Sequence, residues 1–149
     1  MSISIMLPDM SPYRLKDDER WRGVGHGDRI EVSLSGLNDR QEWYSSMVNR
    51  YFEGREPEVV RRCPEIYGLI CFEKPWMNRY FPVNNDFHLT ISCDTSGAGQ
   101  VVEHPSCNVR ANYREGMVLD YYYGRNHLEN WREIHRGLID LIDGLQNKD

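Results

Sequence analysis

The chain lacks any apolar run that approaches the ~20 residues of a membrane-spanning helix. It also lacks internal repeats and low-complexity tracts, and its 40% hydrophobic and 28% charged residues are ordinary values for a globular protein. A chain of 149 residues is long enough to bury about two-thirds of the surface that its unfolded form exposes. We therefore expect a single domain over residues 1–149.

Basic residues are in the minority. The 18 Lys and Arg residues against 23 Asp and Glu residues give a net charge of −5 at pH 7. A surface of this sign repels nucleic acid and attracts a basic protein or a cation. We expect no nucleic acid as the main partner.

The common motifs of hydrolases and metalloenzymes are absent. The Gly-x-Ser-x-Gly motif of serine hydrolases does not occur, and the five histidines form no His-Glu-x-x-His or similar metal frame. His26 and Asp28 are the nearest approach to an acid–base pair, but an aspartate supporting a surface histidine near a turn is the simpler interpretation. We expect no catalytic residue, no metal and no cofactor, although a site assembled from distant segments would escape this argument.

A phosphate-binding loop is also excluded by its context. Gly23, Gly25 and Gly27 lie close together, as glycines do in such loops. They lead into the alternating strand pattern 29–34, whereas a phosphate loop leads into a helix whose N-terminus holds the anion.

The four cysteines form two local pairs, Cys63 with Cys71 and Cys93 with Cys107, and contain no Cys-x-x-Cys. Zinc sites usually need that tighter spacing, so disulfides are the favoured interpretation, ahead of buried free thiols and of a zinc site that includes His104. Disulfides would place the chain in an oxidising compartment.

The stretch from Phe87 to Tyr123 organises the predicted fold. Apolar and polar residues alternate in 87–93 and again in 117–123, with Cys107–Tyr113 between them, which predicts a three-stranded antiparallel meander. Cys93 and Cys107 share the inward-facing parity at the loop ends of neighbouring strands, so their side chains are placed to meet.

The remaining patterns predict further strands and two amphipathic helices. Strands are expected at 3–7, 29–34 and 66–72. A helix is expected from an N-cap at Asn38 to Gly54, and a second from an N-cap at Asn126 to Leu145. The predicted class is α+β: a single domain with a twisted antiparallel sheet of about five to six strands and two helices packed on it.

The apolar residues of segment 73–82 show neither the spacing of a helix nor that of a strand. It contains Trp76, Arg79 and Tyr80, residue types that often anchor protein interfaces. Either it is a loop folded back over the sheet, or it is a binding surface.

Several short signatures occur in the same order as in bacterial proteins associated with type VI secretion gene clusters. The chain thereby resembles the periplasmic immunity proteins of these systems, which neutralise lipase or cell-envelope toxins. The signatures are Leu7-Pro8-Asp9-Met10, Gly27-Asp28-Arg29, Tyr67-Gly68-Leu69 with Cys71, Ile91-Ser92-Cys93 with Pro105-Ser106-Cys107, and Leu128-x-x-Trp131-Arg132-x-Ile134.

The resemblance implies a non-enzymatic protein that binds and inhibits a cognate effector toxin in the periplasm. Such proteins typically carry a membrane anchor or a lipoprotein signal, and because a strand pattern begins at Ile3 we expect a leader or anchor upstream. The alternatives are a small hydrolytic enzyme or effector, a structural envelope protein with another partner, and a cytoplasmic location.

An inhibitor of this kind needs aromatic and arginine anchors together with complementary charge. We expect the toxin-binding surface to include Trp76, Arg79 and Tyr80, with acidic contributions from Asp86 and Glu103.

Overall fold

The computed structural model describes residues 2–7, 10–12, 29–36, 42–56, 60–84, 86–95, 105–114 and 116–146. The elements in chain order are β1 (Ser2–Met6), β2 (Ser11–Pro12), β3 (Arg29–Gly36), α2 (Glu42–Phe52), β4 (Arg61–Ile66), β5 (Leu69–Glu73), β6 (Met77–Pro82), β7 (Leu89–Asp94), β8 (Ser106–Asn112), β9 (Met117–Gly124), the 3-10 helix η3 (Arg125–Asn130) and α3 (Trp131–Gln146).

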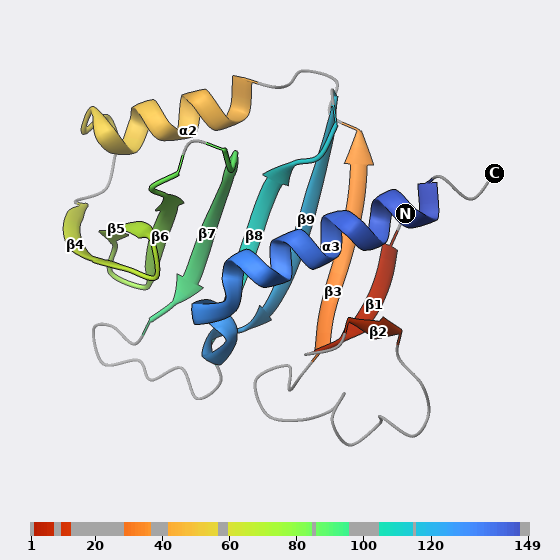
Figure 1. Ribbon diagram of the computed structural model, residues 1–149. Coiled ribbons are helices and arrows are strands. Elements are labelled where there is room, and N and C mark those ends of the chain that lie inside the picture. The colour runs from red at the N-terminus through yellow and green to blue at the C-terminus, as the bar shows by residue number, and fades with distance from the viewer. Residues whose placement is uncertain are drawn as a thin grey trace.

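Within these ranges nine strands form one antiparallel sheet in the order β2-β1-β3-β9-β8-β7-β6-β5-β4 (Figure 1). The α+β class and the two packed helices agree with the prediction, and so does the meander β7–β8–β9. The predicted number of five to six strands was too low.

The undercount arises mainly between residues 61 and 82. The single strand expected over 66–72 is interrupted at Tyr67 and Gly68, whose φ angles of 55° and 74° form a two-residue hairpin turn between β4 and β5. The segment 73–82, which shows no period, supplies β6. A second meander, β4–β5–β6, therefore extends the sheet.

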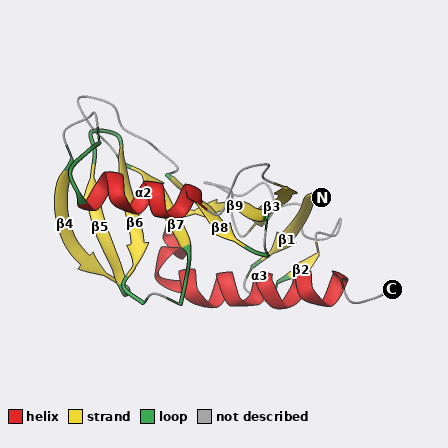
Figure 2. Cartoon of the chain, turned by 90° about the horizontal axis from the view of Figure 1, so that it is seen from above, coloured by secondary structure: helices red, strands yellow, loops and turns green. Residues whose placement is uncertain are grey.

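The two helices lie on opposite faces of the sheet (Figure 2). The face under α3 holds the larger core, because Leu119, Tyr121 and Tyr123 of β9 point to it with the apolar residues of the neighbouring strands. The helix contributes Trp131, Ile134, Leu138 and Ile142 to that core.

The opposite face has a smaller core, which is confined to one end of the sheet. Tyr51 of α2 packs there against Phe72 of β5 and Phe81 of β6, with ring centroids 5.4 and 5.5 Å away. The helix α2 thus covers the β5–β6 end of this face, and the rest of the face has no helix over it among the described elements (Figure 2).

Both predicted disulfides are present. Cys63 and Cys71 lie opposite each other on β4 and β5, and Cys93 and Cys107 on β7 and β8, with Cα–Cα distances of 5.0 and 4.0 Å. Each bond therefore joins neighbouring strands of the sheet, and the first holds the edge strand β4.

The helix termini differ in part from the prediction. Asn126 does not cap the last helix: it lies inside η3, whose N-cap is Gly124, and the α-helix begins at Trp131. Helix α2 ends at Phe52, just before Gly54 with its φ of 68°, as expected. Its predicted cap at Asn38 lies outside the described residues. Neither described helix has the length and apolar character to cross a membrane.

Candidate functional site

The predicted anchor residues do not share one surface. Arg79 and Tyr80 are neighbours on β6, so their side chains point to opposite faces of the sheet. Arg79 faces α2, whereas Tyr80 is 3% exposed and belongs to the core under α3. Trp76 lies in the turn before β6 and is 54% exposed. Tyr80 is therefore a core residue in this fold.

Of the two predicted acidic residues, Asp86 lies within the described part of the chain. Asp86 is exposed in the turn after β6, where its backbone N–H donates to Oδ1 of Asn84 at 2.9 Å. Glu103, like His26, Asp28 and His104, lies outside the described residues. Of the predicted set, Arg79 lines a hollow beside α2, and Tyr80 lines a smaller one beside the β4–β5 turn and η3.

The part of the sheet face that α2 leaves open is lined by polar side chains. The strands alternate, so the residues between the core positions of β7, β8 and β9 all point to this face. They are Thr90 and Ser92, Asn108 and Arg110, and Asp120 and Tyr122. We call this surface the open face.

Two contacts fix α2 as one wall of the open face. Nε1 of Trp43 donates a hydrogen bond to Oδ1 of Asn112 at 2.7 Å, which joins the start of the helix to the end of β8. The ring of Tyr44 stacks on His88, with centroids 5.2 Å apart and an interplanar angle of 14°.

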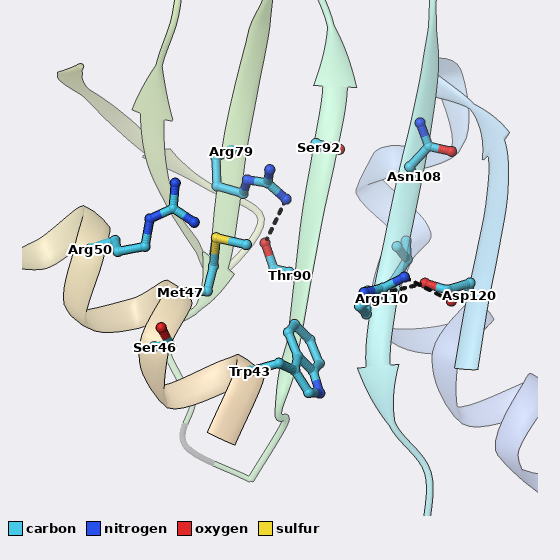
Figure 3. A pocket seen from close by; sticks show the side chains of 11 residues that line it. Trp43, Ser46, Met47, Arg50, Arg79, Thr90, Ser92, Asn108, Arg110 and Asp120 are labelled. Carbon is cyan, nitrogen blue, oxygen red and sulfur yellow. Dashed lines mark hydrogen bonds and ion pairs between the residues drawn. The ribbon is translucent and has the colours of Figure 1, made fainter. Parts of the chain in front are cut away.

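A groove of about 500 Å³ runs between this wall and strands β7 to β9 (Figure 3). A smaller hollow of about 180 Å³ continues it toward β3 and shares Asn108, Val109 and Asp120 with it. The groove is lined by Trp43, Ser46, Met47, Arg50, Arg79, Thr90, Ser92, Asn108, Val109, Arg110 and Asp120.

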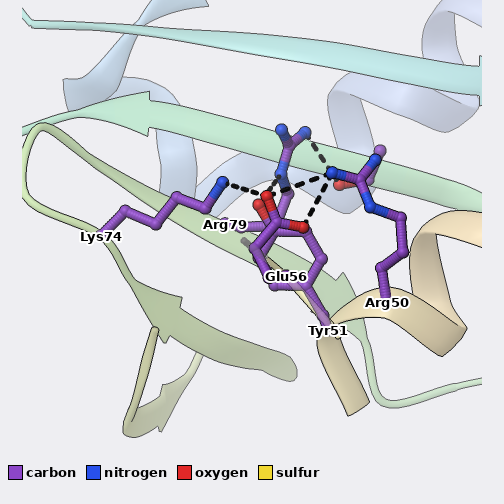
Figure 4. A network of polar contacts seen from close by, with 6 residues as sticks. Arg50, Tyr51, Glu56, Lys74 and Arg79 are labelled. Carbon is purple, nitrogen blue, oxygen red and sulfur yellow. Dashed lines mark hydrogen bonds and ion pairs between the residues drawn. The ribbon is translucent and has the colours of Figure 1, made fainter. Parts of the chain in front are cut away.

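Cations gather at the α2 end of the groove around a single carboxylate (Figure 4). Glu56 accepts from Nζ of Lys74 at 2.7 Å and pairs with Nη2 of Arg50 at 2.9 Å. Burial raises the pKa of Glu56, but the hydrogen bond from Lys74 and the charges of Lys74, Arg50 and Arg79 outweigh burial and lower it overall. The carboxylate is therefore ionised in the folded protein.

Arg79 lies beside this cluster and has no ion-pair partner in the described part of the chain. Its Nε donates to the Tyr51 hydroxyl and its Nη1 to Oγ1 of Thr90, both at 3.4 Å. Across the groove, Arg110 is neutralised by Asp120 through hydrogen bonds of 2.8 and 3.3 Å.

No cluster of three or more His, Cys, Asp or Glu side chains suited to a metal ion occurs among the described residues. What the groove offers is hydrogen-bond donors, one aromatic wall and an excess of positive charge. These are binding features, and the sequence signal for them was the polar half of each alternating strand together with Trp43 on the predicted helix.

The fold is similar to that of an immunity protein of the Stenotrophomonas maltophilia type IV secretion system. The TM-score is 0.63, and the match covers 96% of this chain and 80% of that chain at 13% sequence identity. No family model matches the sequence, and no curated protein matches it.

Proposed function

We propose that the chain is an immunity protein, which binds a secreted antibacterial toxin and inhibits it without catalysing a reaction. The observation that carries this proposal is the similarity of nearly the whole fold to an immunity protein. That protein serves a type IV secretion system, whereas the short sequence signatures resemble proteins of type VI clusters. More specifically, we propose that the toxin is delivered by a type VI system.

The open face is the binding surface that the structure supports best. Its groove has an aromatic residue and arginines, the residue types that carry most of the binding energy in protein interfaces. The sheet beneath it is held by two disulfides, so that little conformational freedom is lost on binding. Trp76 and Asp86 remain predictions for contacts outside the groove.

The periplasm is the proposed location. Two disulfides between neighbouring strands require an oxidising compartment to form and persist. Attachment of the protein to the membrane by an anchor is part of the same proposal.

The test is protection of living cells. The toxin encoded beside the gene for this chain is exported to the periplasm of a susceptible bacterium, with and without the chain exported to the same compartment. We expect the chain to restore growth, and the purified chain to abolish the toxin's activity near a one-to-one ratio. Unchanged killing, or turnover of envelope substrates by the purified chain alone, would contradict the proposal.

A further inference from the structure

The α2 end of the groove is locally basic in a protein that is acidic as a whole. Among the described residues, Arg50, Lys74 and Arg79 surround Glu56, so three positive charges lie around this one carboxylate. The net charge of the chain is −5. Such an excess of cations beside a groove is unfavourable unless an anion joins them.

Arg79 has donors left for that anion. Its guanidinium carries five N–H groups, of which Nε–H and one on Nη1 are directed to Tyr51 and Thr90. Both contacts are long at 3.4 Å, and Nη2 has no partner among the described residues. The Nη1–Nη2 edge can therefore donate two parallel hydrogen bonds to one planar group.

The surroundings of Arg79 suit a carboxylate. Ser92 lies directly opposite Arg79 in the β6–β7 ladder, and its hydroxyl lines the same groove. Trp43 and Met47 of α2 form the apolar part of the wall, which strengthens charge interactions by limiting water (Figure 3). A fork of two N–H groups matches the two oxygens of a carboxylate in distance and plane.

We propose that this end of the groove binds the carboxylate of an acidic side chain that the toxin inserts between α2 and strand β7, with Arg79 as the principal donor. This inference rests on the proposed function and adds the chemistry of the partner. The overall negative charge steers a basic toxin toward the protein at long range, while the buried carboxylate fixes its position at short range.

The first experiment compares toxin affinity among variants at Arg79. Arg79→Gln should weaken binding by about 10- to 100-fold, because the buried carboxylate would lose its bidentate partner. Arg79→Lys keeps the charge but not the fork, and should give an intermediate loss. Arg55→Gln is the matched control, because it removes the same charge from an exposed ion pair with Glu53 outside the groove.

A charge exchange identifies the partner side chain. The acidic residues of the toxin are changed one at a time to Arg, and each variant is tested against Arg79→Glu. One toxin variant should bind Arg79→Glu more tightly than it binds the unchanged chain. If all Arg79 variants bind within about twofold of the unchanged chain while remaining folded, the inference is wrong although the proposed function stands.

A second measurement needs no toxin. Sodium acetate is titrated into the 15N-labelled protein against sodium chloride of equal ionic strength, and the indole N–H of Trp43 and the Nε–H of Arg79 are followed by NMR. Both signals should shift with acetate in the unchanged chain and in Arg55→Gln. In Arg79→Gln, which has no guanidinium signal, the indole N–H of Trp43 should not shift. Equal shifts with chloride would overturn the carboxylate assignment whether or not a toxin has been found.

Discussion

Nε1 of Trp43 lies 2.7 Å from Oδ1 of Asn112, and this hydrogen bond joins two residues that are 69 positions apart in the chain. It holds the first turn of α2 against the end of β8, beside the groove. Trp43→Phe should lower the free energy of unfolding by about 1–2 kcal/mol, because the partly buried amide oxygen loses its donor. Urea unfolding followed by circular dichroism measures this difference.

The control for the Trp43–Asn112 contact is a double-mutant cycle. Trp43→Phe should cost clearly less in an Asn112→Ala background than in the unchanged chain, since the bond is already missing there. Equal costs in the two backgrounds would show that the loss comes from the packing of the indole and not from the hydrogen bond.

Acid should destabilise the protein through His135. The ring is buried between α3 and β9, its Nδ1 lies 3.1 Å from the Tyr121 hydroxyl, and burial lowers the pKa of His135 from 6.5 to about 4. Because the unfolded chain binds the proton more readily, stability falls as the pH drops below about 6.5 and levels off below about 4. Between these two limits the free energy of unfolding falls by about 3 kcal/mol.

Urea unfolding at a series of pH values between 7 and 4 measures the His135 effect. His135→Gln should flatten the pH dependence in that window, whatever its own cost in stability. His88→Gln, which changes an exposed histidine on the other side of the sheet, should leave the slope as it is. A slope that survives in His135→Gln would assign the acid sensitivity to other groups.

Removal of the Cys93–Cys107 disulfide should lower the free energy of unfolding more than removal of the Cys63–Cys71 disulfide does. The loss of chain entropy in the unfolded state predicts that each disulfide adds about 3 kcal/mol to the free energy of unfolding, because the closed loops are of similar size. The sulfurs of Cys93 and Cys107 are fully buried, whereas Cys63 is partly exposed on the edge strand. Each pair is replaced by alanine, and thermal unfolding is compared with the unchanged chain.

Thiol counting provides the complementary check on the disulfides. Mass spectrometry of protein from an oxidising compartment should find no free thiol before reduction and four after it. Free thiols before reduction would contradict both the pairing and the proposed periplasmic location.

Tyr80 and Trp76 should behave differently although both were predicted to be anchors. Tyr80→Ala should lower the free energy of unfolding by about 3 kcal/mol or more, because it leaves a cavity in the core under α3. Trp76→Ala should change it by less than about 0.5 kcal/mol, because the ring is exposed in a turn. Comparable losses for the two variants would contradict this placement.

The period-two patterns were sufficient to predict the meander and the pairing of Cys93 with Cys107. They were not sufficient for the hairpin at Tyr67 and Gly68, because an uninterrupted apolar run conceals a two-residue turn. They also missed β6, because Tyr80 and Phe81 are buried on opposite faces of the sheet and the strand shows no alternation of apolar and polar residues.

The groove on the open face could not be predicted from the sequence either. It depends on which face α2 covers and on contacts such as Trp43 with Asn112, which join distant segments. The burial of Tyr80 was missed for a related reason: adjacent residues of a strand point to opposite faces of the sheet, and Tyr80 points to the core under α3.

Radical footprinting of the chain in complex with its toxin tests the central claim most directly, because it reports which side chains become covered. Trp43, Met47 and Tyr122 lie on the open face or its wall, and Tyr67 and Leu145 are exposed elsewhere. We predict that oxidation of the first three falls in the complex while that of Tyr67 and Leu145 stays unchanged. Protection of Tyr67 or Leu145 with an unprotected Trp43 would contradict the claim that the toxin binds at the open face.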